Sequence, residues 1–362
     1  MVAGETGLAI QKNELQHKTA ALAVWAKQQL RSFGVEGGDN AVERWTPLGG
    51  DAGFRHYFRL AKESLSCTQG VMAVWSPPAT EKNDEFVRMA QHLKAGGVCT
   101  PSIMGYQPET GFLLVEDLGT EALLDRLNEQ SVELLYSRAL DVLLHIQQCP
   151  KDSTLYGRYD AAELNREMNL FSEWFVTQLL GYRLTDNDNV MISEAFQYLT
   201  RVALEQPTVV VHRDFHSRNI IYRDAQPFGI IDFQDGVLGP LTYDAVSLLR
   251  DCYVQWPKEK VTQWALTYAA KAKSAGLLPE LEDTTFLRWF DCMGVQRHIK
   301  VLGIFARLFL RDGKKGYLND LPLVIQYTRD VAGEYTELAP FVRWFDEHLM
   351  PRINQQPWMI KK

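Results

Sequence analysis

The sequence predicts an α+β fold in which a small β-rich N-terminal lobe precedes a larger helical C-terminal lobe. Short strand patterns and a glycine-rich segment occupy the first third of the chain, and long stretches with apolar residues at helical spacing fill most of the rest. The change in character falls near Asp117. We therefore expect one lobe over residues 1–117 and a second over residues 118–362.

In the N-terminal part, the apolar spacing predicts helices over residues 15–30 and around residues 86–93, the second ending at Gly96-Gly97. Strand patterns cover residues 57–60, 71–75 and 112–115. In the C-terminal part, helices are predicted over residues 131–148, 164–180, 192–204, 243–256, 258–275 and 286–311. The strand patterns there are short and cover residues 208–211, 220–222 and 228–231.

The composition narrows the class of protein. Of 362 residues, 46% are hydrophobic and 23% charged, which is typical of a globular protein, and the net charge of −7 argues against nucleic-acid binding. No apolar run approaches the length that a membrane-spanning helix needs. The five cysteines are widely spaced and form no metal-binding pattern, so we expect reduced thiols in a cytoplasmic protein.

The segment over residues 209–235 carries the most chemistry. His212-Arg213-Asp214 follows one Val-rich strand, Asn219 comes five residues after Asp214, and Asp232 follows a second apolar strand. Asp214 can orient an attacking hydroxyl and accept its proton, while Asn219 and Asp232 offer oxygen ligands for Mg²⁺. A single Asp after a strand is usually a turn or a cap, but three such groups in this order rarely arise by chance.

This arrangement resembles the aminoglycoside-phosphotransferase and choline-kinase branch of the protein-kinase-like fold. That branch typically has His-Gly-Asp-x-His-x-x-Asn, where this chain has Arg213 in place of the glycine, and then Ile-Asp-Phe, which residues 231–233 match. The resemblance implies a two-lobe kinase that uses ATP and Mg²⁺, with Asp214 as the catalytic residue and Asn219 and Asp232 as metal ligands.

A closer resemblance is to bacterial anomeric kinases of N-acetylmuramate and N-acetylglucosamine, carried by residues 51–59, 111–119, 294–307 and 311–314. It implies an amino-sugar substrate phosphorylated at the C1 hydroxyl during peptidoglycan recycling. The alternatives are a kinase of another small hydroxylated metabolite or of an aminoglycoside, and a catalytically inactive kinase-like binding module. The sequence does not determine the oligomeric state.

The nucleotide site is predicted from the N-terminal part. Gly49, Gly50 and Gly53 would let backbone amides approach the ATP phosphates, although a simple turn explains them as well. Glu116 and Leu118 fall where the family's hinge contacts adenine; a polar linker is the alternative.

One expected part of the nucleotide site is missing. The strand over residues 71–75 lacks the lysine that kinases use to bind the α- and β-phosphates. Arg55, or else Arg59, is our candidate to replace it, and either one could instead be a solvated strand residue.

The acceptor site is predicted mainly from the helix over residues 286–311. Its cations fall on one face, which either lies in solvent or binds an anionic group of the substrate or an ATP phosphate. These cations are Arg297, Lys300, Arg307 and Arg311. Such a face would suit a sugar acid and repel a polycationic aminoglycoside. The other candidate substrate contacts are Glu167, Trp174 and Asp235, with core packing the alternative for Trp174. Asp244 resembles a residue that supports the catalytic loop, and N-capping of the next helix explains it as well.

Overall fold

The computed structural model describes residues 2–32, 45–48, 54–60 and 70–359, with side chains described from residue 17 onward. The chain divides into two compact units. The first comprises Met1–Glu121 and Ile221–Gln234, and the second comprises Ala122–Ile220 and Asp235–Lys362.

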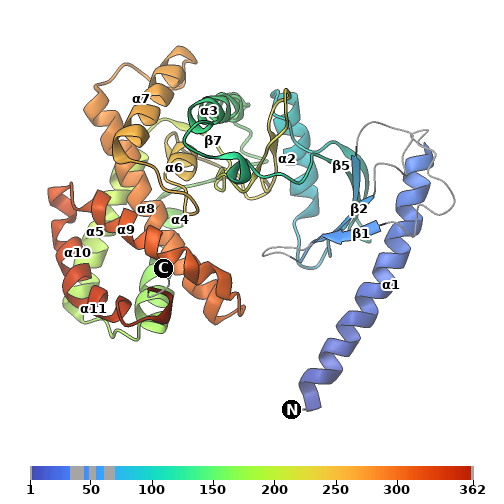
Figure 1. The fold of residues 1–362 in the computed structure, drawn as a ribbon, viewed down its shortest axis with the longest axis horizontal. Helices are drawn as coiled ribbons and strands as arrows, with labels where there is room; N and C mark the ends of the chain where they lie inside the picture. Colours follow the sequence, from blue (N-terminus) through green and yellow to red (C-terminus); the bar gives the residue numbers. More distant parts are fainter. Residues whose placement is uncertain (1, 33–44, 49–53, 61–69, 360–362) are drawn as a thin grey trace. The chain divides into compact units, whose positions relative to one another are not determined.

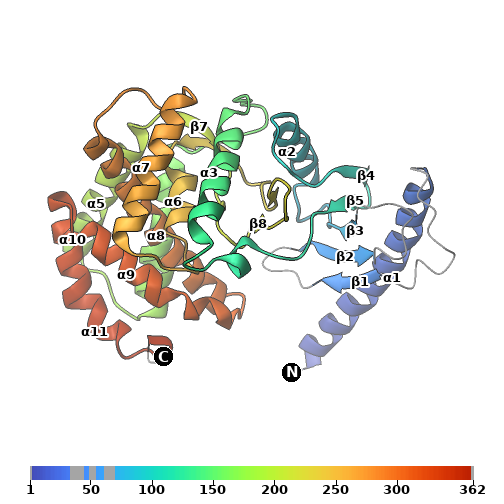
Figure 2. The ribbon, with the colours of Figure 1, turned by 45° about the horizontal axis from the view of Figure 1, so that its top comes forward.

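The first unit is built on a five-stranded antiparallel sheet with the order β1-β2-β3-β5-β4 (Figure 2). Its strands are β1 (Trp45–Leu48), β2 (His56–Leu60), β3 (Gly70–Trp75), β4 (Ile103–Gln107) and β5 (Phe112–Asp117). Pro47 lies in the edge strand β1, where a residue without an N–H group breaks no central ladder.

Helix α1 (Val2–Ser32) packs on one face of this sheet. Leu22, Ala26 and Leu30 contact alternate strand residues such as Phe58 and Val71. Because successive side chains of a strand point to opposite faces, Tyr57 and Arg59 of β2 belong to the face away from α1. Helix α2 (Asn83–Ala95) also belongs to this unit.

A second part of the chain returns to this unit. The pair β8 (Ile220–Ile221) and β9 (Gly229–Ile230) is joined to it by two backbone hydrogen bonds, Tyr222 N–H to Glu121 O and Ile230 N–H to Cys99 O, each 2.8 Å. These long-range bonds explain why residues 221–234 group with the N-terminal part, whereas a single boundary at Asp117 assigned them to the C-terminal part.

The second unit is mainly helical, and α8 (Asp283–Leu310) runs through its centre (Figure 1). The helices around or beyond it are α3 (Val132–Gln148), α4 (Ala161–Leu170), α5 (Asp186–Leu204), α6 (Tyr243–Leu249), α7 (Lys258–Ser274), α9 (Leu321–Ala332), α10 (Ala339–Trp344) and α11 (Met350–Ile353). A π-helix, η4 (Phe171–Leu179), continues α4. The small sheet of this unit has the order β6-β10-β7, from β6 (Gly157–Arg158), β7 (Thr208–Val211) and β10 (Val237–Pro240).

The architecture confirms the predicted α+β fold with a β-rich N-terminal part and a larger helical C-terminal part. The helix predicted over residues 243–256 was too long, because α6 ends at Leu249 and Arg250 leaves the helical conformation. The sequence patterns did not predict β1, β4, β6 and β10, nor the helices after residue 320. The described cysteines form no disulfide, and no helix in the described part of the chain is long and apolar enough to cross a membrane.

Candidate active site

The loop that follows β7 carries Asp214. Val209, Val210 and Val211 are buried, and β7 pairs with β10 in an antiparallel ladder, so the strand is a fixed base for the loop. Asp214 keeps 43% of its side chain exposed. The buried strand therefore positions the Asp214 carboxylate where a ligand can reach it.

The beginning of this loop is held by Asp244 of α6. Its carboxylate accepts the backbone N–H groups of His212 at 2.6 Å and of Arg213 at 3.0 Å. Burial raises the pKa of Asp244 to about 7, against the lowering effect of these hydrogen bonds and of Arg297. Thr242, and not Asp244, occupies the N-cap position of α6. Asp244 therefore supports the loop and does not cap the helix.

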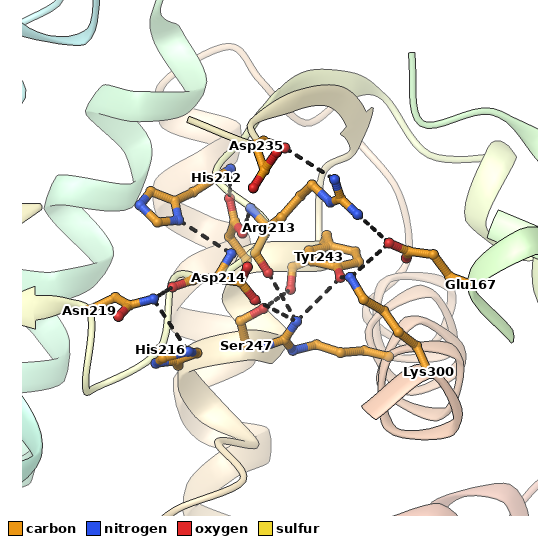
Figure 3. Close-up of polar contacts among 12 residues, drawn as sticks. Glu167, His212, Arg213, Asp214, His216, Asn219, Asp235, Tyr243, Ser247 and Lys300 are labelled. Atoms are coloured by element: carbon orange, nitrogen blue, oxygen red, sulfur yellow. Dashed lines mark hydrogen bonds and ion pairs between the residues drawn. The ribbon is translucent and has the colours of Figure 1, made fainter. Parts of the chain in front are cut away.

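The end of the loop is held by Asp251, which the sequence analysis missed. Its buried carboxylate accepts the backbone N–H of Ser217 at 2.9 Å and the Ser217 hydroxyl at 2.5 Å. Between these anchors, the Asn219 side-chain N–H donates to the Asp214 carbonyl at 3.0 Å (Figure 3). Because the amide nitrogen of Asn219 is used within the loop, its amide oxygen is the atom suited to a metal ion.

Two cations of α8 lie behind Asp214. Arg297 donates to the carbonyl of Arg213 at 3.0 Å and to the Tyr243 hydroxyl at 3.3 Å, and its guanidinium is 3.8 Å from the Asp214 carboxylate. Lys300 donates to the Tyr243 hydroxyl at 2.9 Å and pairs with Glu167 at 3.0 Å. Both cations are buried, so the solvated-face interpretation is wrong for them, whereas Arg311 is exposed and pairs with Asp312.

These cations lower the pKa of the Asp214 carboxylate. Partial burial would raise the pKa of Asp214, but Lys300 and Arg297 outweigh this effect and lower the pKa to about 2. Asp214 is therefore ionised at neutral pH and is a weak base.

Glu167 joins α4 to the same group of residues. It is buried, accepts hydrogen bonds from the Tyr159 hydroxyl and from the Arg213 guanidinium, and pairs with Lys300. Burial would raise its pKa, but Lys300 and Arg213 overcome that effect and hold the pKa below its usual value. All of its acceptor oxygens thus have partners within the protein.

Arg213 has an unusual backbone conformation. Its φ is +76°, in the left-handed region, which costs a residue other than glycine about 1–2 kcal/mol. The side chain is held at both ends of the guanidinium, by Glu167 and by the backbone carbonyl of Asp235 at 3.3 Å (Figure 3). Asp235, a predicted substrate contact, thus lies beside the loop, whereas no described contact links the half-buried Trp174 of η4 to Asp214.

Asp232 lies in the first unit, just after β9. Its φ is +64°, the Gln234 amide donates to its carboxylate at 2.7 Å, and the neighbouring Phe233 stacks on Phe86. In the described part of the chain, no group of three or more His, Cys, Asp or Glu side chains could hold a metal ion by itself. A carboxylate oxygen, completed by phosphate oxygens and water, is nevertheless a ligand type that suits Mg²⁺.

The two arginine candidates for phosphate binding differ in their contacts. Arg59 makes two hydrogen bonds to Asp117, at 2.6 and 2.9 Å, and is committed to β5. Arg55 donates to Ser76 at 3.1 Å, pairs with Glu81 and lies over the Phe86 ring. Burial raises the pKa of Tyr57, the charge of Arg55 lowers it, and the charge of Asp232 raises it further. Arg55 and Asp232 therefore both act electrostatically on Tyr57.

The other predicted nucleotide contacts are only partly described. The Glu116 side chain accepts the Ser102 hydroxyl at 2.5 Å and is used internally, while Leu118 is buried and packs closely on Gly229. Gly49, Gly50 and Gly53 lie outside the described residues.

Three comparisons place the chain among known proteins. Residues 44–287 match the phosphotransferase enzyme family. The chain is 40% identical over 320 residues to the N-acetylmuramate/N-acetylglucosamine kinase of Pseudomonas putida, which covers 88% of this chain and 93% of that protein.

Two solved structures share the fold. An ADP-bound aminoglycoside phosphotransferase matches 80% of this chain and 93% of its own with a TM-score of 0.53 at 15% identity. An ethanolamine kinase of Plasmodium vivax matches 84% and 85% with a TM-score of 0.59 at 12% identity.

The kinase-like fold and the anchored loop around Asp214 define an enzyme of the kinase type that transfers a phosphoryl group to a hydroxyl. The chain belongs to the phosphotransferase enzyme family, as its resemblance to the aminoglycoside-phosphotransferase and choline-kinase branch predicted.

Proposed function

We propose that this protein is an ATP-dependent kinase that phosphorylates the C1 hydroxyl of N-acetylmuramate and N-acetylglucosamine. The observation that carries the proposal is the 40% identity, across 88% of the chain, to a kinase named for these two amino sugars. The anchored loop around Asp214 supports it, because it keeps the carboxylate that the reaction needs.

The low pKa of Asp214, about 2, suits this acceptor. In a loose phosphoryl-transfer transition state the nucleophile keeps its proton until late, so the carboxylate mainly orients the hydroxyl and takes the proton afterwards. An anomeric hydroxyl is more acidic than an ordinary alcohol. A weak base such as Asp214 can therefore serve it.

The Asp232 carboxylate and the Asn219 amide oxygen would hold Mg²⁺. The metal ion would neutralise charge on the transferred phosphoryl group and on the leaving group. Gln234, which donates to Asp232, would keep that carboxylate in place.

Arg55 is the proposed replacement for the missing strand lysine. Arg55 and Asp232 both act electrostatically on Tyr57, whereas Arg59 is already paired with Asp117. The backbone of Glu116 and Leu118 is the proposed contact for adenine, since the Glu116 side chain is used internally. Backbone amides at Gly49, Gly50 and Gly53 would bind the phosphates.

The proposed substrates imply a cellular role. Both amino sugars are building units of peptidoglycan, and ATP is available in the cytoplasm. We place the reaction there, as a step that returns cell-wall sugars to metabolism as sugar 1-phosphates.

The test is a screen for ATP turnover with the two amino sugars, kanamycin and ethanolamine, followed by phosphorus NMR of the product. We expect a 1-phosphate of both amino sugars and no turnover of their methyl glycosides, in which C1 is blocked, while changes at C6 are tolerated. A 6-phosphate, or turnover of kanamycin or ethanolamine without either amino sugar, would overturn the assignment. A complete lack of ATP turnover would indicate an inactive binding module.

A further inference from the structure

The backbone of Arg213 points to a role for its side chain. At φ +76° a glycine is unstrained, whereas an arginine is held there against its own preference. Strained residues of this kind persist where the surrounding structure fixes them, and they cluster at functional sites. Here the fixing contacts are those of the guanidinium with Glu167 and with the Asp235 carbonyl.

Arg213 belongs to the same loop as the Asp214 carboxylate. Arg213 and Asp214 are adjacent in the chain, and the guanidinium extends toward Glu167 and Asp235 (Figure 3). Tyr159 lies under it, with 5.7 Å from the guanidinium carbon to the centre of the ring. A hydroxyl at Asp214 and a second group at Arg213 can thus belong to one small acceptor.

Arg213 also differs from the two cations behind it in its access to a ligand. Its side chain is 17% exposed, whereas those of Arg297 and Lys300 are 4% and 5% exposed. Arg297 and Lys300 are committed to Tyr243, Glu167 and the loop backbone. These two therefore hold the loop, and Arg213 is the cation of this cluster that a substrate can reach.

The charges around Arg213 favour an anionic partner. Four cations, Arg166, Arg213, Arg297 and Lys300, pair with three carboxylates, Glu163, Glu167 and Asp214. One positive charge in this group is therefore not neutralised by an ion pair within it. A guanidinium can also bind a carboxylate through two parallel hydrogen bonds, which a neutral acceptor cannot use.

We propose that Arg213 is the specificity-determining residue that binds the carboxylate of an acidic acceptor sugar, and that it makes the enzyme prefer N-acetylmuramate to N-acetylglucosamine. This inference rests on the proposed function, because it assumes both amino sugars as acceptors. The loop residue Arg213, and not the buried cations of α8, would then recognise the acid.

The test compares the two acceptors in Arg213→Gly, which removes the guanidinium and relieves the backbone. The ratio of kcat/KM for N-acetylmuramate to that for N-acetylglucosamine should fall at least tenfold, mainly through a higher KM for the acid. Arg213→Lys, which keeps the charge without the fork, should give an intermediate ratio. For the wild-type enzyme, the methyl ester of the acid should behave as the acid does with Arg213→Gly.

Arg166→Gln is the matched control. Arg166 lies on the same helix as Glu167 and pairs with Glu163, which is 3.9 Å from the Arg213 guanidinium, but its side chain is 58% exposed. Its loss should change the ratio less than twofold. An equal fall in this variant would mean that general electrostatics and not Arg213 select the acid, and would overturn the inference.

The remaining outcomes also separate the two proposals. If the wild type phosphorylates both sugars and Arg213→Gly leaves the ratio unchanged, the inference alone is wrong. If the wild type phosphorylates neither sugar, the proposed function is wrong and the inference falls with it. Melting temperatures check folding, and if Arg213→Gly does not fold, an unchanged ratio in Arg213→Lys together with equal turnover of acid and ester overturns the inference.

Discussion

Asp251 accepts two hydrogen bonds from Ser217, one from its backbone N–H and one from its hydroxyl. With Asp244, it fixes both ends of the loop that carries Asp214, from the segment that contains α6. Both carboxylates are buried, so each replaces water as the partner of the loop's polar groups.

The first prediction concerns this second anchor. Asp251→Ala leaves the Ser217 N–H and hydroxyl without their partner, so the free energy of unfolding should fall by about 1–3 kcal/mol. We also expect kcat to fall at least tenfold, because Asp214 and Asn219 share the loop. Chemical denaturation and steady-state kinetics of Asp251→Ala, Ser217→Ala and the double variant measure both effects. Strictly additive losses would show that the two side chains are not coupled.

The second prediction concerns Asp214. Asp214→Ala should lower kcat about a hundredfold or more, because the acceptor hydroxyl loses the group that orients it and takes its proton. The dissociation constant of ATP should change by less than about threefold. Isothermal titration and single-turnover kinetics separate the two effects. Loss of ATP binding with unchanged chemistry in the remaining complex would contradict the catalytic role.

The third prediction concerns Asp232, the proposed metal ligand. Asp232→Asn should lower kcat by about three orders of magnitude and raise the Mg²⁺ concentration needed for half-maximal activity, since a neutral amide binds the ion less strongly. Circular dichroism should show an intact fold. Asp224→Asn, an exposed position in the same segment, is the control and should stay within about twofold of wild type. Near-normal turnover of Asp232→Asn would remove Asp232 from the metal site.

The fourth prediction concerns pH. Burial raises the pKa of Asp244 from 3.8 to about 7, so between these values the folded chain binds more protons at this site than the unfolded chain. The contribution of Asp244 to stability is therefore full below about pH 3.8 and is lost as the pH rises through 7. Asp244→Asn cannot titrate. The melting temperature of wild type relative to this variant should thus fall from pH 4.5 to 7.5, and a constant difference would contradict the raised pKa.

The fifth prediction concerns the packing of α8. A Cβ atom on Gly303 would lie 2.4 Å from the carbonyl carbon of Leu170 and 2.5 Å from the Phe171 nitrogen. Both are backbone atoms where α4 meets η4, so a helix would have to move. Gly303→Ala should lower the free energy of unfolding by about 1–3 kcal/mol despite the better helix propensity of alanine.

Gly316→Ala is the control for that change, because a Cβ there meets nothing within 4 Å. Its stability should equal or exceed that of wild type in the same denaturation experiment. A Gly303→Ala variant as stable as Gly316→Ala would show that α8 and η4 can separate at little cost.

The sequence by itself determined the parts of this protein that depend on local pattern. The order of strands and helices, the loop of His212 to Asn219, and Asp232 after its strand all follow from residues close together in the chain. Apolar spacing predicts an element because backbone geometry places side chains at fixed intervals on its faces. The same spacing predicted too long a helix at α6. The helix ends at Leu249, just before Asp251 accepts its hydrogen bonds from Ser217.

Only the tertiary structure decided what covers each face and which distant groups meet. Arg297 and Lys300 share one face of α8 in either interpretation, and it was the contact with Tyr243, Glu167 and the loop that buried them. Residues 221–234 joined the first unit through backbone hydrogen bonds to residues far away in the sequence. Periodicity predicts which side chains lie on the same face of an element. Their burial, their pKa values and their contact partners are decided only when separate elements pack together.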